Sequence, residues 1–303
     1  MNDALAFDRN FDPRHDEAVV VAPGVRRITA GNEGPFTFRG TNSYLIGTGS
    51  LALIDPGPAD EAHAAALMKA TSGERITDII VTHTHRDHSE GAALIKERTG
   101  ASTHGGGPHR LSRPASEGES ALVEASADTR FQPDHLLADG TTVEGDGWRL
   151  EAIATPGHTA NHFALAMPAG AIVFTGDHIM AWSTTVVAPP DGSMTDYMAS
   201  LERMNGRAET TYLPGHGGPA IDGPAYARAL RNHRLMREAA ILERLKRGDR
   251  TIPAIVATVY RDTDPRLHGA AGLSVLAHLE ALIAQGRVRS EGEPGIGARF
   301  LPA

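Results

Sequence analysis

The sequence predicts an α/β protein followed by a small winged-helix-like domain, and two observations support this prediction. Over the first two thirds of the 303 residues, short β-branched runs alternate with Gly/Pro turns and amphipathic stretches, as in sheets covered by helices. From Pro224 the pattern changes to long helical stretches with an excess of positive charge. We therefore expect a first domain over residues 1–223 and a second over residues 224–303.

The elements of the first domain follow from its apolar runs and the residues that bound them. LALID (51–55) is a predicted strand, and Asp60 is expected to cap a helix that runs to about Lys69. ITDIIVTH (76–83) is a second strand, and residues 89–100 have a helical pattern that ends at a glycine. Four later apolar runs predict further strands, at residues 148–158, 163–167, 171–177 and 211–216.

The second domain is predicted to contain three helices and a hairpin. Residues 224–247 form a long basic helical pattern that stops at Gly248, and residues 251–260 form a short helix. A third helical stretch, 273–286, ends at a glycine, and the short runs RVRS and ARFL then flank the turn GEPGIG. Three helices and a hairpin are the elements of a small winged-helix unit.

Composition narrows the kind of site that the chain can build. Hydrophobic residues make up 41% of the chain and charged residues 22%, which excludes disordered and fibrous proteins. Because there is no cysteine, a disulfide framework, a thiolate nucleophile and a cysteine-ligated metal are excluded. Any metal must therefore be held by His, Asp or Glu side chains.

Charge and the N-terminal sequence bear on partners and location. The net charge is −8, yet residues 228–303 hold 13 Lys and Arg against 8 Asp and Glu. The first 18 residues lack both a basic start and an apolar stretch, so we expect neither a signal peptide nor a membrane anchor. The expectation is a cytoplasmic protein with two surfaces of different charge.

The stretch VTHTHRDHSEG, residues 81–91, is the strongest candidate for a functional site. His83, His85, Asp87 and His88 fall within six positions directly after a predicted strand. Imidazole and carboxylate groups are the ligands of zinc and related divalent metals. Alone, such a motif fits a solvated polar turn as well as a metal site.

Three further residues favour the metal site. His158 in TPGHT, Asp177 in FTGD and His216 in LPGHG each lie at a predicted strand end beside a glycine, which allows close backbone approach. Together with the first motif they make five histidines and two aspartates. Seven ligands are enough for two metal ions if one aspartate bridges both.

This set, with its order along the chain, resembles that of the metallo-β-lactamase superfamily. The resemblance covers about residues 18–220 and implies a four-layer αβ/βα sandwich. It also implies that His83, His85 and His158 hold one divalent metal, that Asp87, His88 and His216 hold a second, and that Asp177 lies between them. The expected metal is zinc, with iron or manganese as alternatives.

The resemblance also implies hydrolysis by a hydroxide that bridges the two metals. Asp87 is then a catalytic residue as well as a ligand, because it can orient the hydroxide or shuttle its proton. Asp55 in LIDPG matches an aspartate that supports a ligand histidine, and a turn-forming role before Pro-Gly is an equal alternative. Asn42, His178 and Trp182 are candidate substrate contacts, the last in an aperiodic segment (182–195) expected to be a lid or pocket wall.

The tail and the stretches GTNSYLIG and GDHIMAWSTTVVAPPDGSM are similar to those of the β-lactamase-like protein 2 family. Animal members of that family are single-strand endoribonucleases, whereas fungal and bacterial relatives cleave thioesters. The substrate is therefore expected to be a small ester or thioester, or a phosphodiester such as single-stranded RNA. An iron-dependent persulfide oxygenase on the same scaffold is a further alternative.

The sequence is compatible with several roles for the tail. Its third helix has no Lys or Arg between Leu273 and Gln285, which argues against reading of duplex DNA. We expect the tail to pack on the hydrolase, to shape the pocket or to form a homodimer. In the non-enzymatic alternative, it binds nucleic acid through the arginines of residues 228–247 while the metal domain senses a ligand.

Overall fold

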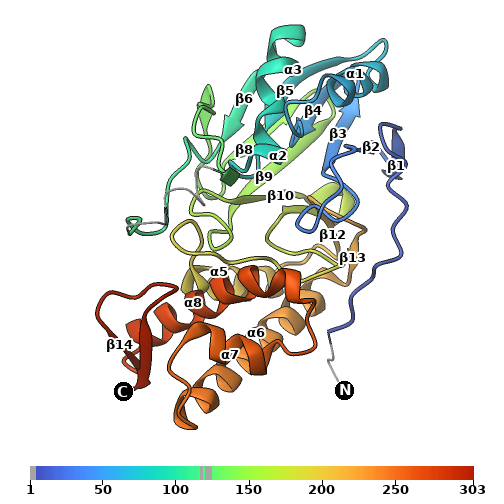
Figure 1. Ribbon diagram of the computed structural model, residues 1–303. Coiled ribbons are helices and arrows are strands. Elements are labelled where there is room, and N and C mark those ends of the chain that lie inside the picture. The colour runs from blue at the N-terminus through green and yellow to red at the C-terminus, as the bar shows by residue number, and fades with distance from the viewer. Residues whose placement is uncertain (1–4, 117–118, 120–124) are drawn as a thin grey trace.

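The structure is a computed structural model that describes residues 5–116, 119 and 125–303 (Figure 1). Two β-sheets pack face to face, with α-helices on the outer side of each, so the expected α/β architecture is confirmed. The first sheet has seven strands in chain order, of which the first four pair antiparallel and the rest parallel. They are β1 (Val19–Ala22), β2 (Val25–Thr29), β3 (Asn42–Thr48), β4 (Ser50–Ile54), β5 (Arg75–Ile80), β6 (Ser102–Gly105) and β7 (His135–Leu136).

The second sheet has six strands in the order β13-β12-β11-β10-β9-β8. All of its neighbours pair antiparallel except β11 and β12. Its strands are β8 (Thr142–Gly145), β9 (Trp148–Ala154), β10 (Phe163–Met167), β11 (Ile172–Gly176), β12 (Thr211–Pro214) and β13 (Ala220–Ile221). A short 3₁₀ turn, η1 (Pro168–Gly170), joins β10 to β11.

Helices cover the outer face of each sheet, and three apolar clusters hold the layers together. Between the sheets, buried side chains such as Ile54 and Phe174 face one another. Outside the first sheet lie α1 (Glu61–Ala70), α2 (Arg86–Ser89) and α3 (Gly91–Thr99), with Leu67 and Ile95 in the cluster beneath them. Outside the second sheet, α5 (Met194–Asn205) contributes Leu201 to the third cluster.

Local signals in the sequence explain where the first helices begin and end. The Asp60 carboxylate accepts hydrogen bonds from the backbone N–H groups of Ala62 and His63, at 2.7 and 3.4 Å, and so caps α1 as predicted. Gly100 ends α3 with a φ of +73°, in the left-handed region that glycine adopts without strain. These helices therefore hold fixed positions behind the strand ends of the first sheet.

The C-terminal part consists of three helices and a two-stranded sheet, as predicted. These are α6 (Gly223–Lys246), α7 (Ile252–Val259), α8 (His268–Ala284), β14 (Val288–Glu291) and β15 (Arg299–Pro302), with a 3₁₀ turn η2 (Pro265–Leu267) before α8. The helix α6 contributes Leu230 to the apolar cluster of the second sheet and Ile241 to a separate C-terminal cluster. The C-terminal part is therefore packed on the two-sheet part of the molecule, on the side opposite α1 and α3 (Figure 1).

One stretch of the described residues, Pro265–Ala284, is long and apolar enough to cross a membrane by length and composition. Its apolar side chains include Val275, Leu276, Leu279 and Leu282, which are buried in the C-terminal cluster. A packed core helix passes the same test of length and hydropathy, and the packing of α8 is that of a core helix.

Candidate metal centre

Four loops at one edge of the two sheets bring the seven predicted ligands together. The turn after β5 presents His83 and His85, and α2 presents Asp87 and His88. His158 lies in the loop between β9 and β10, Asp177 directly follows β11, and His216 follows β12. The sheets thus hold on rigid strand ends a set of side chains that is far apart in sequence.

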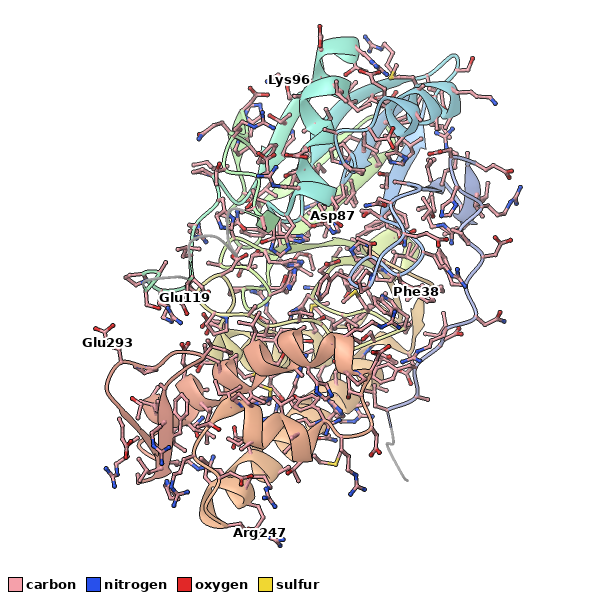
Figure 2. The ribbon with its side chains drawn as sticks, in the orientation of Figure 1. Phe38, Asp87, Lys96, Glu119, Arg247 and Glu293 are labelled. Carbon is pink, nitrogen blue, oxygen red and sulfur yellow. The ribbon has the colours of Figure 1, made fainter. Side chains whose placement is uncertain are left out.

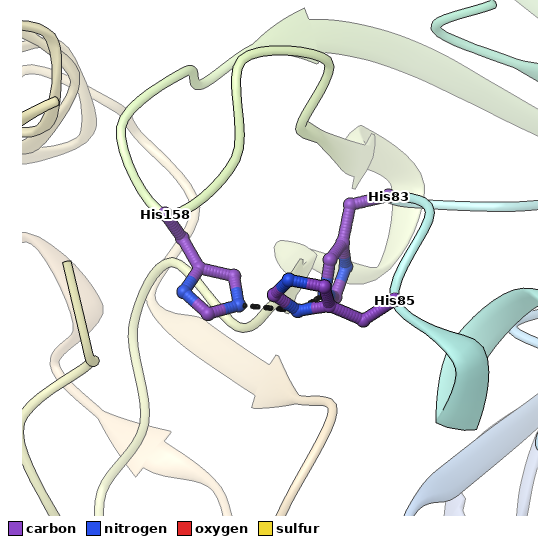
Figure 3. Close-up of side chains that lie close together, drawn as sticks. All are labelled: His83, His85 and His158. Atoms are coloured by element: carbon purple, nitrogen blue, oxygen red, sulfur yellow. Dashed lines mark hydrogen bonds between the residues drawn. The ribbon is translucent and has the colours of Figure 1, made fainter. Parts of the chain in front are cut away.

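Three histidines form the first group, and Figure 3 shows their rings converging. The Nδ1 atom of His85 lies 3.1 Å from Nε2 of His83 and 2.9 Å from Nε2 of His158. Nε2 of His158 lies 3.6 Å from Oδ2 of Asp177. Three nitrogens and a carboxylate oxygen therefore surround one small volume.

The second group lies on the other side of Asp177. Nε2 of His88 and Nε2 of His216 are 3.3 Å apart, and each is 3.3 Å from Oδ2 of Asp87. Oδ2 of Asp177 is 3.4 Å from Nε2 of His216, and its Oδ1 is 3.5 Å from Nε2 of His88. Asp177 thus reaches both groups.

The outer nitrogen of every one of these histidines faces an acceptor that fixes where the ring carries its proton. An N–H at that position leaves a lone pair on the inner nitrogen, the arrangement found in metal-binding histidines. The acceptors are Thr82 Oγ1 for His83, Asp191 Oδ2 for His85, Asp55 Oδ2 for His88, the Val186 carbonyl for His158 and the Gly40 carbonyl for His216.

The donor set fits divalent metal ions. Around a tetrahedral zinc with ligand distances of about 2.0–2.1 Å, neighbouring donor atoms are about 3.3 Å apart, and the donor pairs in closest contact within the two groups are 2.9–3.6 Å apart. Inner nitrogens that carry lone pairs repel one another at such distances unless a cation or proton lies between them. In addition, Oδ1 of Asp177 is buried with no hydrogen-bond partner among the described residues.

The electrostatics of the second group favour positive charge. Burial would lower the pKa of His216, but the carboxylates of Asp177 and Asp87 outweigh it and raise the pKa to about 10. Burial would raise the pKa of Asp177, yet His216 and His88 hold it well below the usual range. Because divalent cations can replace these histidine protons, metal binding here releases protons.

Two of the three histidines of the first group are held neutral, whereas the Asp191 carboxylate outweighs burial and raises the pKa of His85. Burial, followed by the nearby charge of His85, lowers the pKa of His158 to about 4. Burial also places the pKa of His83 well below its ordinary value, with His88 as the next cause. Neutral imidazoles at physiological pH are ready to bind a metal without first losing a proton.

Asp55 supports the ligands through hydrogen bonds. Its Oδ2 accepts from Nδ1 of His88 at 2.9 Å and from Oγ1 of Thr82 at 2.8 Å, and its Oδ1 accepts from the Thr82 backbone N–H at 2.8 Å. Since the Thr82 hydroxyl donates to Asp55, it must accept from His83. Asp55 also has a φ of +51° before Pro56-Gly57, so the turn-forming alternative describes the same residue.

The three candidate substrate contacts have different surroundings. Asn42 is fully buried, and its side chain accepts from Thr29 and donates to the carbonyls of Pro214 and Gly217; it ties β3 to the His216 loop instead of facing the cavity. His178 is also fully buried, with its ring 4.9 Å from that of Tyr197, and does not line the cavity.

Trp182 does line the cavity, where it stacks on Phe38 with ring centroids 4.7 Å apart. The cavity has a volume of about 720 Å³ and opens onto Asp87, His158 and Asp177. About half of its other lining residues are apolar or aromatic, and several belong to α6, α8 and the segment between α7 and α8. The C-terminal part therefore shapes the pocket, one of the roles expected for it.

Two functional contacts were not found from the sequence. Asp191, which accepts from His85 at 2.9 Å, lies in the aperiodic segment expected to be a pocket wall. The carbonyl of Val186, in the same segment, accepts from His158 at 2.6 Å. Backbone carbonyls leave no sequence signal, and Asp191, although it precedes Gly192, does not lie at the end of a predicted strand as His158, Asp177 and His216 do.

Comparison with known proteins agrees with this geometry. A family model described as the metallo-beta-lactamase superfamily matches residues 36–216, and one described as the beta-lactamase associated winged helix domain matches residues 251–297. Over 276 residues the chain is 34% identical to the beta-lactamase-like protein 2 homolog of Caenorhabditis elegans, covering 89% of this chain and 88% of that protein.

A second relative and a solved structure extend the comparison. The chain is 31% identical over 252 residues to an atrochrysone carboxyl ACP thioesterase of Aspergillus chevalieri, covering 79% of this chain and 74% of the relative. The crystal structure of a beta-lactamase domain protein from Burkholderia ambifaria has a TM-score of 0.77 at 21% identity, covering 97% of this chain and 96% of that one.

The family match spans more than half of the chain, and its range ends at the last of the seven clustered ligands. The fold neighbour has the same architecture over nearly its full length. The chain therefore belongs to the metallo-β-lactamase superfamily of hydrolases and has the winged-helix domain associated with it.

Proposed function

We propose that this enzyme is a dinuclear hydrolase, with zinc as its metal, that cleaves an acyl thioester or a related ester. One observation supports the dinuclear centre above all: five imidazole nitrogens and two carboxylates face one another while every outer imidazole nitrogen has an acceptor. A site rich in imidazole and without thiolates suits zinc, and iron and manganese accept the same donors.

When bound, two such cations would lower the pKa of a water between them and polarise the carbonyl of the substrate. The side chains of the chain would hold and orient the reactants. Oδ2 of Asp87 accepts a hydrogen bond from Oγ1 of Thr41 at 2.9 Å, and its carboxylate is partly exposed to the cavity. It can therefore receive a proton at the cavity wall, which supports a catalytic part for Asp87 besides ligation.

The cavity supports a small acyl substrate. Its lining near the ligands includes Met180, Trp182 and Val186, which suit an acyl chain more than a row of phosphates. The fungal relative described above is named as a thioesterase that acts on an ACP-linked substrate. Cleavage of single-stranded RNA is the second candidate, because Phe36 and Arg9 also line the cavity and are exposed, as a stacking and phosphate-binding surface would be.

A parallel turnover assay tests this proposal. Metal-replete enzyme is given an acyl thioester, labelled single-stranded RNA and a lactam, each with and without a chelator, and oxygen uptake is recorded with a persulfide. We expect thioester cleavage that the chelator abolishes and added zinc restores. Thioester cleavage that is absent or insensitive to chelator would overturn the proposal, and stoichiometric oxygen uptake would favour the iron-dependent oxygenase.

A further inference from the structure

The C-terminal domain contributes a basic wall to the cavity. His233, Arg234 and Arg237 line it from α6, and Tyr260 and Ser274 lie beside them on the segments that follow. Among the described residues that line the cavity, the carboxylates are those of Asp87, Asp177 and Asp191, which belong to the metal centre. The cavity therefore has an acidic metal end and a basic end.

Arg234 is buried and has no carboxylate partner among the residues that the structure describes. It is 2% exposed, and its Nη2 donates to the carbonyl of Thr185, whose hydroxyl donates to the carbonyl of Asp177. Its guanidinium carbon lies 5.2 Å from the ring centroid of Tyr197, and its Nε has no acceptor in the described part of the chain. Thr185 therefore links Arg234 to Asp177, the ligand that reaches both metal groups.

Arg237, one turn further along α6, is half-buried and likewise has no carboxylate partner among the described residues. Its Nη1 donates to the carbonyl of Val259 at 2.6 Å, and its guanidinium carbon lies 4.7 Å from the ring centroid of Tyr260. Its Nε also lacks an acceptor among the residues described. Each arginine has five N–H donors, so one carbonyl and one aromatic face leave most of its hydrogen-bonding capacity unused.

Two histidines, His233 and His278, lie near the arginines. Burial, followed by the charges of Arg234 and Arg237, lowers the pKa of His233 to about 4. His278 of α8 is 1% exposed, and neither of its ring nitrogens has a partner within the described ranges. Buried cations with unsatisfied donors are costly unless an anion or ordered water completes them.

We propose that Arg234 and Arg237, with His233 beside them, bind an anionic oxygen group of the substrate, either a carboxylate or a phosphate. Guanidinium groups hold both through charge-assisted hydrogen bonds. The substrate would then be a thioester that bears this group at a distance from the scissile carbonyl, on its acyl side or on its thiol side. This inference rests on the proposed hydrolase function and names the substrate class of that same site.

The first test compares substrates that differ only in charge. Zinc-loaded wild type, Arg237→Gln and Arg237→Lys are assayed with a neutral acyl thioester of N-acetylcysteamine, its succinyl counterpart and a phosphopantetheine thioester. Arg247→Gln is the matched control, because Arg247 ends the same helix far from Asp87 and is exposed (Figure 2). The melting temperature of each variant shows whether it is folded.

We expect the preference for an anionic over the neutral thioester, as a ratio of kcat/KM, to fall about 10-fold or more in Arg237→Gln. Arg237→Lys should lose less, since it keeps the charge, and Arg247→Gln should keep the wild-type ratio. Loss with the succinyl substrate assigns the group to the acyl side, and loss with the phosphopantetheine substrate assigns it to the thiol side. An unchanged ratio for both in folded Arg237→Gln would overturn the proposal.

A binding measurement separates this inference from the proposed function. Inorganic phosphate and succinate are titrated into the zinc-loaded proteins by calorimetry, which needs no turnover. Affinity that is about 10-fold weaker in Arg237→Gln than in Arg247→Gln supports the anion site even if no thioester is cleaved, in which case only the thioesterase assignment fails. Equal affinity for both anions in the two variants would overturn the anion site.

Discussion

Two aspartates outside the ligand set fix the orientation of the ligand histidines, and they do so in different ways. Asp55 is an acceptor at both oxygens, since two groups of Thr82 and the His88 ring donate to it. Asp191 accepts from His85 through Oδ2, whereas its Oδ1 has no hydrogen-bond partner among the described residues. An asparagine can therefore replace Asp191 with its NH₂ group at a position that no donor occupies. At Asp55 the NH₂ group of an asparagine would have to face a donor at either position.

We therefore predict that Asp55→Asn lowers the free energy of unfolding of the metal-free protein by about 1–3 kcal/mol, because its NH₂ group must face a donor. Asp191→Asn should cost clearly less, with the amide oxygen kept toward His85. Both should weaken metal binding about 10–100-fold. Urea unfolding and metal competition titrations check these values, and equal destabilisation by the two substitutions would contradict the asymmetry.

At this scale the sequence predicted which side chains cluster, but not all of the groups around them. His158, Asp177 and His216 were marked by glycine at strand ends, and the structure brings them together with the first motif. Asn42 looked like a substrate contact because it stands in a polar stretch before a strand, but all its hydrogen bonds are made inside the protein. The direction of a side chain at the start of a strand depends on how that strand pairs with its neighbours, which a single sequence does not show.

Among the elements, α6 connects the two parts of the molecule. Its first half places Leu230 in the apolar cluster beneath the second sheet, its middle lines the cavity, and its last turns place Leu245 in the C-terminal cluster. The basic helical pattern predicted the helix and its stop at Gly248. It could not show that a helix with so many arginines is buried at both ends, because that follows from packing on α5, α7 and β15.

We propose that the regions 1–223 and 224–303 unfold as one cooperative unit, and Leu230→Ala tests this. Leu230 is fully buried, so the cavity left behind should cost about 2–5 kcal/mol. Leu235→Ala on the same helix, where the side chain is 40% exposed, is the control and should change the free energy of unfolding by less than about 0.5 kcal/mol. Denaturant curves followed by the fluorescence of Trp148 and Trp182, both in residues 1–223, and by the helical circular dichroism signal should shift together.

Separate transitions, in which only the helical signal responds to Leu230→Ala, would contradict cooperative unfolding.

Packing also explains the apolar third helix of the tail. α8 has buried residues on most of its surface, including Val275, Leu276 and Leu279, which is why Lys and Arg are missing there. Their absence therefore reflects burial of α8, chiefly in the C-terminal cluster and through Ala277 and Ala281 in the cluster of the second sheet.

Across the whole molecule, charge is arranged along the cavity. Carboxylates and histidines gather where strand ends from both sheets meet, and Arg234 and Arg237, which have no carboxylate partner among the described residues, lie where α6 passes. The sequence showed an acidic first part and a basic tail, but only the fold shows that one cavity receives side chains from both. The dinuclear centre proposed for the acidic end requires that cations bind there.

The most direct test is the metal content of the protein. Elemental analysis of purified, metal-replete wild type should find about two divalent ions per chain, and His216→Ala should retain about one, because His83, His85 and His158 stay in place. Folding of both proteins is checked by circular dichroism. A folded wild type that binds no transition metal, or never more than one, would contradict the dinuclear centre.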